Sequence, residues 1–313
     1  MLKVYVTRPL PEKVVRALAE FVDVEIRDET TGLSPAKMNG LMQKYEVLLC
    51  TLGDLAQDFS GDLKCKLLAN FGVGFNHIDV ASAQAAGVAV TNTPGAVTDA
   101  TADIALTLIL MTARRAGEGE RMVRAGLWDG WHPTQLLGSH VTGKTLGVIG
   151  MGRIGQAIAR RCHFGFGMEV LFYNRSPKTV DFPASQLDSL EDVCRRSDIL
   201  TLATPGGADT THLIGASELA AMKREAFLIN ISRGEVVEEA ALVAALKSGQ
   251  IAGAGLDVYE FEPKVSPDLL ALENVTLLPH LGTAALSVRE EMGLMAVDNI
   301  RAYAQSAALI NPV

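Results

Sequence analysis

The sequence lacks the charge pattern of a protein that binds nucleic acid. It contains no basic block, and its formal net charge is −8. Nucleic-acid backbones are bound by clustered Lys and Arg side chains, and this chain has few clusters of that kind to offer. We therefore expect no nucleic-acid partner.

Cysteine is scarce and scattered along the chain. Cys50, Cys65, Cys162 and Cys194 form no C-x-x-C pair, and the chain is not a short secreted one. Disulfide frameworks and zinc sites need closely spaced cysteines. We expect four small core residues with reduced thiols, no metal site and a cytoplasmic protein.

Export and membrane signals are also missing from the sequence. The chain opens on a strand-like segment, with no basic region followed by an apolar one. The most apolar stretch, residues 104–113, is shorter than the roughly 20 residues that cross a bilayer. We expect this stretch to form a buried helix, and we expect no export signal and no membrane segment.

Apolar residues are abundant enough for two folded domains. They make up 48% of the 313 residues, and charged residues make up 20%. Domains average about 150 residues, so this length predicts two of them with a cleft between.

Short β-branched runs alternate with helical stretches in the first third of the chain. This alternation predicts an α/β unit with a mostly parallel sheet. The expected strands are 3–6, 22–26, 46–51, 65–70 and 88–92, and the expected helices include 11–20 and 35–44.

The alternation resumes after a long expected helix, 98–117, and an ordered loop, 126–143, that contains two Trp residues. A strand, glycine turn and helix span 144–162, and further strands are expected at 168–173, 198–203, 226–231, 252–257 and 275–278. The last expected helix, 284–303, returns to the first unit.

This pattern predicts two doubly wound parallel-sheet domains of the α/β class. One is a flavodoxin-like substrate domain, residues 1–98 completed by 286–313. The other is a Rossmann dinucleotide-binding domain, residues 99–285, inserted between two linking helices.

A G-x-G-x-x-G turn made by Gly150, Gly152 and Gly155 lies between an apolar strand and a helix. The first glycine permits a tight turn, the second lets the backbone approach a pyrophosphate, and the third allows close helix packing. Free N–H groups at the helix N-terminus bind the anion. The strand and helix context makes this a dinucleotide-binding signature.

The next strand ends without the expected acid. A carboxylate about 20 residues beyond the glycine turn binds the ribose 2′-hydroxyl of NAD and repels a 2′-phosphate. Here Asn174, Arg175 and Ser176 stand at that end, and they offer a guanidinium and a hydroxyl to phosphate. We predict that NADP(H) is preferred and NAD(H) possible. In the alternative, Arg175 is an ordinary solvated residue.

Three polar residues follow predicted strands in the second unit: Arg233, Glu262 and His280. A cation, an imidazole and a carboxylate suit the reduction of a carbonyl: the first binds a carboxylate and a carbonyl oxygen, the second donates a proton, and the third orients the imidazole. Each has a structural alternative when taken singly, but together they predict a catalytic set.

The chain resembles the D-2-hydroxyacid dehydrogenase family over nearly its whole length. The resemblance rests on six blocks in the family's order: NFGVGFNHID, VTDATADIALTLIL, GVIGMGRIGQAIARR, NISRGEVVEEAAL, GLDVYEFEP and LLPHLGTA. Within the family it is most similar to the glyoxylate/hydroxypyruvate reductases, chiefly through VTDATAD, WDGWHP and the Asn-Arg-Ser strand end.

The resemblance implies a role for each residue of the set. Arg233 would bind the substrate carboxylate and polarise its keto oxygen, His280 would donate the proton, and Glu262 would hydrogen-bond the other imidazole nitrogen. The reduced nicotinamide would pass a hydride to C2 of a 2-oxo acid, which yields a D-2-hydroxy acid. The backbone amides of Val73 and Gly74 would also bind the substrate carboxylate; the alternative is that their glycine-rich turn is only structural.

The resemblance further implies a set of cofactor contacts beyond the glycine turn and the strand end. They are Thr101, Arg153, Ile154, Thr204, Ile231, Asp257 and Gly282, with Asp257 near the nicotinamide amide. The family usually has Glu where this chain has Asp103.

Trp128 and Trp131 are large amphipathic side chains of the kind enriched at interfaces. Related reductases extend this loop to a partner subunit, so we expect a homodimer. Packing of both Trp residues within one subunit is the alternative.

The function predicted from the sequence is an NADPH-preferring reductase of small 2-oxo acids, glyoxylate or hydroxypyruvate. One alternative is an NAD-dependent dehydrogenase of another D-2-hydroxy acid, of the 3-phosphoglycerate or lactate type. The other is a non-enzymatic nucleotide-sensing protein of the corepressor type.

Overall fold

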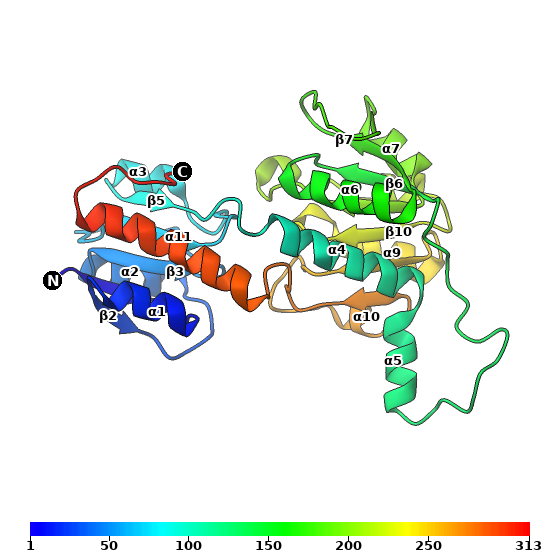
Figure 1. The fold of residues 1–313 in the computed structure, drawn as a ribbon, viewed down its shortest axis with the longest axis horizontal. Coiled ribbons are helices and arrows are strands. Elements are labelled where there is room, and N and C mark those ends of the chain that lie inside the picture. The colour runs from blue at the N-terminus through cyan, green and yellow to red at the C-terminus, as the bar shows by residue number, and fades with distance from the viewer. The chain divides into compact units, whose positions relative to one another are not determined.

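The computed structural model describes all residues, 1–313, and divides into two compact units. Unit 1 comprises residues 1–97 and 283–313, and unit 2 comprises residues 98–282. The sequence places the boundaries at 98/99 and 285/286, whereas the contacts divide the chain at 97/98 and 282/283. Each unit holds one sheet of its own (Figure 1).

Unit 1 is built on a five-stranded sheet in the order β2-β1-β3-β4-β5. All neighbouring strands run parallel, and this order is that of flavodoxin-like folds. Its strands are β1 (Lys3–Val6), β2 (Asp23–Ile26), β3 (Val47–Thr51), β4 (Leu67–Phe71) and β5 (Ala89–Thr91). Four of the five residues of β3 and all five of β4 are buried, as is typical of central strands covered on both faces.

Four helices complete unit 1: α1 (Glu12–Ala19), α2 (Pro35–Lys44), α3 (Val80–Ala85) and α11 (Leu286–Ala304). The last of these comes from the C-terminal segment and packs against α1 and β4 (Figure 1). The return of the C-terminal helix to the first unit is as predicted from the sequence.

Unit 2 is built on a seven-stranded parallel sheet in the order β12-β11-β10-β9-β6-β7-β8. Strands β6 to β11 reproduce the Rossmann arrangement, and β12 adds a seventh strand beside β11. Its strands are β6 (Thr145–Ile149), β7 (Glu169–Tyr173), β8 (Ser185–Gln186), β9 (Ile199–Leu202), β10 (Phe227–Asn230), β11 (Gly253–Leu256) and β12 (Val275–Leu277).

Helices cover both faces of this second sheet. They are α4 (Thr98–Ala113), α6 (Arg153–Phe166), α7 (Leu190–Arg196), α8 (Ala216–Ala221), α9 (Glu239–Ser248) and α10 (Pro267–Leu270), with short 3₁₀ turns η1 (Ala208–Thr210) and η2 (Gly234–Val236). A further helix, α5 (Ala116–Arg124), has no buried residue and contacts α4. Buried residues of α4 and α6 belong to one core cluster, and those of α7, α8 and α9 belong to another. The two doubly wound domains predicted from the sequence are therefore present.

The prediction of one helix over residues 98–117 is wrong beyond Ala113, where α4 ends. The Ser139 N–H donates to the Ala113 carbonyl at 2.7 Å, and Arg115 takes a left-handed backbone with φ 52°. A residue that is not glycine or asparagine rarely continues a helix from that conformation. The chain therefore turns and starts α5, which projects from the body of unit 2 with the loop that follows it (Figure 1).

All four cysteines are buried and none is in a disulfide. Burial raises the pKa of the Cys65, Cys162 and Cys194 thiols to about 12, so each stays protonated and unreactive near neutral pH. None of the helices has both the length and the apolar character needed to cross a bilayer.

Candidate active site

The strand order of unit 2 reverses between β6 and β9, which lie side by side although β7 and β8 separate them in sequence. Ligands of open α/β sheets bind outside the carboxyl ends of the strands at such a reversal. The glycine turn follows β6, and Thr204 follows β9. Both therefore stand where this fold binds its ligand.

The glycine turn has the close approaches that its sequence predicts. Gly150 has φ 97°, and a Cβ there would lie 2.8 Å from the Ala203 carbonyl oxygen. A Cβ on Gly155 would lie 2.2 Å from the Gly150 oxygen. Only glycine fits at either position, because these neighbours are backbone atoms that cannot move aside.

The start of α6 leaves its N–H groups open to an anion. Gly152 is the N-cap and provides no side-chain cap, and no acid lies in the first turn. A Cβ on Gly152 would meet nothing within 4 Å. Exposed Arg153 adds a cation beside these groups, while Ile154 is half-buried against the core. The arrangement fits the pyrophosphate of a dinucleotide.

Arg233 stands directly beyond β10, in a loop held by Asn230. The Asn230 amide donates to the Arg233 carbonyl at 2.9 Å and accepts from the Ser232 amide at 3.0 Å. The guanidinium is half-buried, and one of its nitrogens, Nη1, donates to the Ser232 carbonyl at 2.7 Å. Burial lowers the pKa of Arg233, while the charges of Glu235 and Glu262 oppose that shift. Because the ordinary pKa of an arginine side chain lies far above neutral pH, Arg233 remains a cation near neutral pH.

Glu262 and His280 form a hydrogen-bonded pair. His280 Nδ1 lies 3.0 Å from Glu262 Oε2, and the two side chains are 32% and 31% exposed. The Tyr259 amide donates to the other carboxylate oxygen of Glu262 at 3.0 Å, and the Tyr259 hydroxyl donates to the Leu278 carbonyl at 2.9 Å. Tyr259 therefore ties the loop that carries Glu262 to the strand end that precedes His280.

Glu262 is held in its ionised form. Burial raises its pKa, but the hydrogen bond and charge of His280, the Tyr259 amide and the charge of Arg233 together lower it below the usual value. A carboxylate at Nδ1 leaves Nε2 as the ring nitrogen that can exchange a proton with a ligand. Arg233, Glu262 and His280 are called the catalytic set below.

The backbone of His280 is in the left-handed region, with φ 54°. Its N–H donates to the Asp257 carbonyl at 2.9 Å, and the Asp257 carboxylate accepts from the amides of Leu281 and Gly282 at 2.7 and 2.8 Å. Burial raises the pKa of Asp257, and the two amides and His280 oppose the rise. Asp257 thus fixes the turn that holds a strained residue in place.

Other predicted cofactor contacts gather around the same turn and around the end of β9. The Thr101 hydroxyl donates to the Gly282 carbonyl at 3.2 Å. The Thr204 hydroxyl is buried and has no hydrogen-bond partner, and Ile231 is buried at the end of β10. An orphaned hydroxyl beside the glycine turn fits a polar group of a bound dinucleotide.

The Asn-Arg-Ser strand end is more connected than its sequence suggests. The Met151 amide donates to Asn174 Oδ1 at 3.2 Å, and Asn174 Nδ2 donates to the Ser176 carbonyl at 2.8 Å. Arg175 forms an ion pair with Asp209, with Nη1 3.0 Å from Oδ2. Asn174 therefore braces the glycine turn, and Arg175 already has an anionic neighbour. The sequence carried no signal for Asp209.

Val73 and Gly74 lie in unit 1, in the loop that follows β4. Their described hydrogen bonds use the carbonyl oxygens: Val73 accepts from the Asn92 side chain at 2.9 Å and Gly74 from the Asn70 side chain at 3.0 Å. These two hydrogen bonds fix the loop that carries the Val73 and Gly74 amides.

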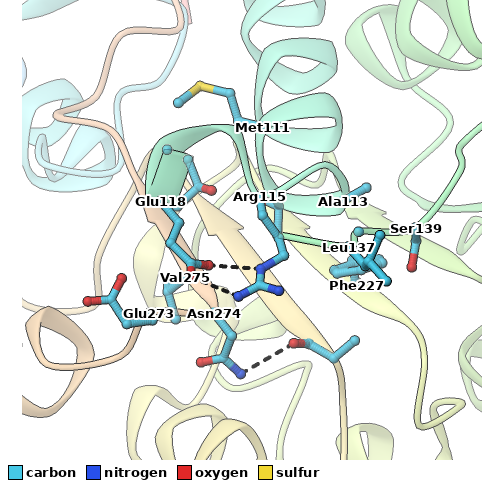
Figure 2. A pocket seen from close by; sticks show the side chains of 15 residues that line it. Met111, Ala113, Arg115, Glu118, Leu137, Ser139, Phe227, Glu273, Asn274 and Val275 are labelled. Carbon is cyan, nitrogen blue, oxygen red and sulfur yellow. Dashed lines mark hydrogen bonds and ion pairs between the residues drawn. The ribbon is translucent and has the colours of Figure 1, made fainter. Parts of the chain in front are cut away.

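A cavity of about 390 Å³ lies elsewhere in unit 2, between the end of α4, the start of α5 and β12. Figure 2 shows Arg115 pointing toward Glu118, with the two ion-pair contacts at 2.9 and 2.7 Å. No member of the catalytic set and no residue of the glycine turn lines this cavity. No group of three or more His, Cys, Asp or Glu side chains in the chain could hold a metal ion.

Comparison with known proteins agrees with this geometry. The model of the family described as D-isomer specific 2-hydroxyacid dehydrogenase, NAD binding domain, matches residues 106–282. The chain belongs to this family. It is therefore an oxidoreductase that uses a nicotinamide cofactor, and the matched residues contain the glycine turn and the whole catalytic set.

Relatives of this 2-hydroxyacid dehydrogenase cover nearly its full length. It is 42% identical to the glyoxylate reductase of Thermococcus kodakarensis, over 96% of this chain and 92% of that one. A crystal structure of a Thermus thermophilus protein has a TM-score of 0.90 and 39% identity, with all of both chains covered. The NADPH-dependent glyoxylate/hydroxypyruvate reductase of Sinorhizobium meliloti, in complex with NADP and malonate, has a TM-score of 0.87 and 34% identity over 100% of this chain and 96% of that one.

Proposed function

We propose that the protein reduces small 2-oxo acids, glyoxylate or hydroxypyruvate, to 2-hydroxy acids, with the D configuration wherever C2 of the product is a stereocentre, and that it prefers NADPH as its reductant. The observation that carries this proposal is the 3.0 Å pair between His280 Nδ1 and Glu262 Oε2 beside the Arg233 cation. It combines a proton donor, a group that orients the donor and a cation for the substrate, which are the parts that carbonyl reduction needs.

His280 donates the proton. Because Glu262 occupies Nδ1, the imidazolium has Nε2 available to protonate the keto oxygen as it becomes a hydroxyl. Ionised Glu262 accepts a hydrogen bond at Nδ1 and thereby orients the ring. Glu262 is a positioning residue in this scheme, because it acts through His280.

Arg233 binds the substrate carboxylate and polarises its keto oxygen. A guanidinium matches a carboxylate with two parallel hydrogen bonds, which fixes the direction of the carbonyl. We propose that the amides of Val73 and Gly74 bind the same carboxylate. Oriented binding of this kind provides much of the acceleration in a hydride transfer.

The dinucleotide is held by the glycine turn, by the N–H groups and Arg153 at the start of α6, and by Thr204, with Thr101, Ile154, Ile231, Asp257 and Gly282 as the remaining contacts. When bound, the reduced nicotinamide supplies the hydride that adds to C2 of the 2-oxo acid. The proton from His280 would go to the carbonyl oxygen at C2, which becomes the hydroxyl of the product. The Asp257 carboxylate accepts hydrogen bonds from the Leu281 and Gly282 amides and so keeps the turn at His280 in place.

NADPH preference is supported by the end of β7. Asn174 carries no charge that would repel a 2′-phosphate, and Arg175 and Ser176 can bind one. The similar Sinorhizobium meliloti reductase is described as NADPH-dependent. NADH use remains the competing proposal, because nothing at this strand end excludes a free 2′-hydroxyl.

The substrate class is supported by relatives that are described as glyoxylate reductases. A 3-phosphoglycerate or lactate dehydrogenase is the alternative among enzymes. A nucleotide-sensing protein without catalysis is the alternative outside them, and an intact catalytic set speaks against it.

The test is the kcat/KM for NADPH and for NADH, measured with saturating glyoxylate and then with saturating hydroxypyruvate. A preference of about tenfold or more for NADPH, worth about 1.4 kcal/mol, supports the proposal. If the protein instead reduces the 2-oxo acids that correspond to D-lactate or 3-phosphoglycerate, the alternative dehydrogenase is the correct assignment. NADPH binding without turnover of any 2-oxo acid would favour the sensing protein.

We also propose that the protein is a homodimer. Trp128 and Trp131 on the projecting segment after α5 are 56% and 79% exposed, and Leu127 and Leu137 beside them are also exposed. Apolar side chains gathered on one projecting segment are typical of an interface. Sedimentation equilibrium should give twice the chain mass of 33.3 kDa. A monomer at micromolar concentration would exclude the proposal.

A further inference from the structure

One ion pair joins two loops of unit 2 at the end where the adenosine ribose is expected. Arg175 follows β7, and Asp209 lies in η1, beyond β9. Arg175 Nη1 is 3.0 Å from Asp209 Oδ2, and the two side chains are 86% and 83% exposed. This is the same guanidinium that the proposed function assigns to a 2′-phosphate.

Both residues stand on braced backbone. The Gln186 side chain donates to the carbonyls of Asn174 and Ser176 at 3.2 and 3.3 Å, on either side of Arg175. The Thr210 hydroxyl, next to Asp209, donates to the Pro205 carbonyl at 2.9 Å. The two Cα positions are therefore set by the fold, and the contact between the side chains is not an accident of two loose loops.

The ion pair between Arg175 and Asp209 is weak, so a stronger anion can replace Asp209 as the partner of Arg175. Exposed ion pairs add little stability, because water solvates both charges and two long side chains lose freedom. A phosphate monoester carries nearly two negative charges near neutral pH and three acceptor oxygens, so it is a better partner for a guanidinium than one carboxylate is. A 2′-phosphate at this place would draw Arg175 away and would meet the carboxylate of Asp209.

We propose that Asp209 sets the coenzyme selectivity of this enzyme by competing with the 2′-phosphate of NADP(H) for Arg175. The carboxylate that this fold usually carries at the end of the second strand is absent at Asn174, and an acid from the loop after β9 restores part of its effect. The preference for NADPH is therefore smaller than Arg175 alone would produce, and NADH remains usable. This inference rests on the proposed 2′-phosphate site at Arg175.

The test measures dissociation constants of the protein for NADPH and NADH by titration of nicotinamide fluorescence, without substrate. It adds the fragments adenosine 2′,5′-bisphosphate and AMP, measured by calorimetry, which report on the ribose site alone. The variants are Asp209→Asn, Arg175→Gln and the double variant. Asp268→Asn is the matched control, because it removes an exposed acid that pairs with Lys247. Asp268 lies in α10, outside the two loops that carry Arg175 and Asp209.

Asp209→Asn should tighten binding of NADPH and of adenosine 2′,5′-bisphosphate by about threefold to tenfold, with NADH and AMP unchanged within about twofold. The gain should shrink in 0.5 M salt, because screening weakens the competing carboxylate. The gain in affinity should also shrink in the double variant, because the Arg175 guanidinium, for which Asp209 and the phosphate compete, is absent. Asp268→Asn should change none of the four constants.

Two failures have different meanings. If Arg175→Gln leaves the ratio of NADPH to NADH affinity unchanged, the proposed 2′-phosphate site is wrong and the inference falls with it. If Arg175→Gln weakens NADPH selectively but Asp209→Asn has no effect, the site stands and only the competition is excluded. Weaker NADH binding by Asp209→Asn would also overturn the competition, because Asp209 would then be a ligand of the ribose hydroxyls.

Discussion

The catalytic set and the ribose corner, which we define as Asn174, Arg175, Ser176 and Asp209, belong to the same sheet but are held in different ways. Glu262 and His280 are about one-third exposed, and backbone hydrogen bonds fix their loops. Arg175 and Asp209 are more than four-fifths exposed, and each holds the other's side chain by one ion pair. Burial and backbone contacts fix the first arrangement. In the second the backbone is also braced, but the side chains of Arg175 and Asp209 are held only by a solvent-screened ion pair.

This difference separates chemistry from selectivity. A group in the catalytic set cannot move without breaking a turn, so substitutions there should have large effects on turnover. A group in the ribose corner can be exchanged at little cost in stability, so substitutions there should move coenzyme preference by modest factors. The four predictions below start with the largest effect.

Replacing His280 should abolish most turnover. His280→Asn keeps a residue that tolerates the left-handed backbone, and it should lower kcat by about 10²–10⁴-fold because the general acid is lost. NADPH affinity should stay within about twofold. His212→Asn is a matched control, since His212 also has a left-handed backbone, at φ 52°, and pairs with Glu260 at 2.7 Å. Near-normal turnover in His280→Asn would rule out the proposed proton donor.

Replacing Arg233 should affect both binding and turnover of the 2-oxo acid. Arg233→Gln should lower kcat/KM by about 10²–10³-fold, because the cation that stabilises the developing oxyanion is removed. Exposed Arg224 serves as the control for a lost surface charge through Arg224→Gln. A rise in KM with unchanged kcat would mean that Arg233 binds the substrate carboxylate without acting on the keto oxygen.

Replacing Glu262 should have a smaller effect that depends on pH. Glu262→Gln should lower kcat by about 10–10²-fold, because the ring keeps a hydrogen-bond partner but loses the carboxylate that pairs with it. The folded-state pKa of Glu262 is below the ordinary value of a glutamate side chain. Ionised Glu262 therefore stabilises the fold above that value, and the contribution is lost as the pH falls through the lower folded-state pKa.

Urea unfolding of wild type and Glu262→Gln at several pH values measures this linkage. The wild-type advantage in the free energy of unfolding should be present at neutral pH and should disappear under acid conditions. An advantage that does not change with pH would exclude the charged pair as its source.

Restoring an acid at the ribose corner should have the smallest effect. Asn174→Asp keeps an oxygen that can accept from the Met151 amide but adds a charge that repels a 2′-phosphate. The dissociation constant for NADPH should rise about tenfold and that for NADH should stay the same or fall, as measured by fluorescence titration. Equal changes for both cofactors would mean that Asn174 acts only by bracing the glycine turn.

Local pattern predicted the strands and the glycine turn because each depends on neighbouring residues. Apolar runs such as Val47–Thr51 need burial on both faces, and Gly150 and Gly155 allow approaches that no side chain permits. The short helices α7, α8 and α10 were not predicted, because 4 to 7 residues give too little periodicity to separate a helix from a turn. The overlong helix at 98–117 failed for a different reason. Its end depends on Ser139, which the sequence places far beyond it.

By itself the sequence determined the fold class, through the alternation of strands and helices, and the position of the glycine turn. It also predicted the catalytic set, from residue types at the carboxyl ends of strands. Only the tertiary structure decided how these residues are held. Tyr259 fixes Glu262, Asp257 fixes the turn at His280, and Asp209 reaches Arg175 from 34 residues away. The physical reason is that hydrogen bonds and ion pairs act over a few ångströms in space, and folding alone determines which distant residues come that close.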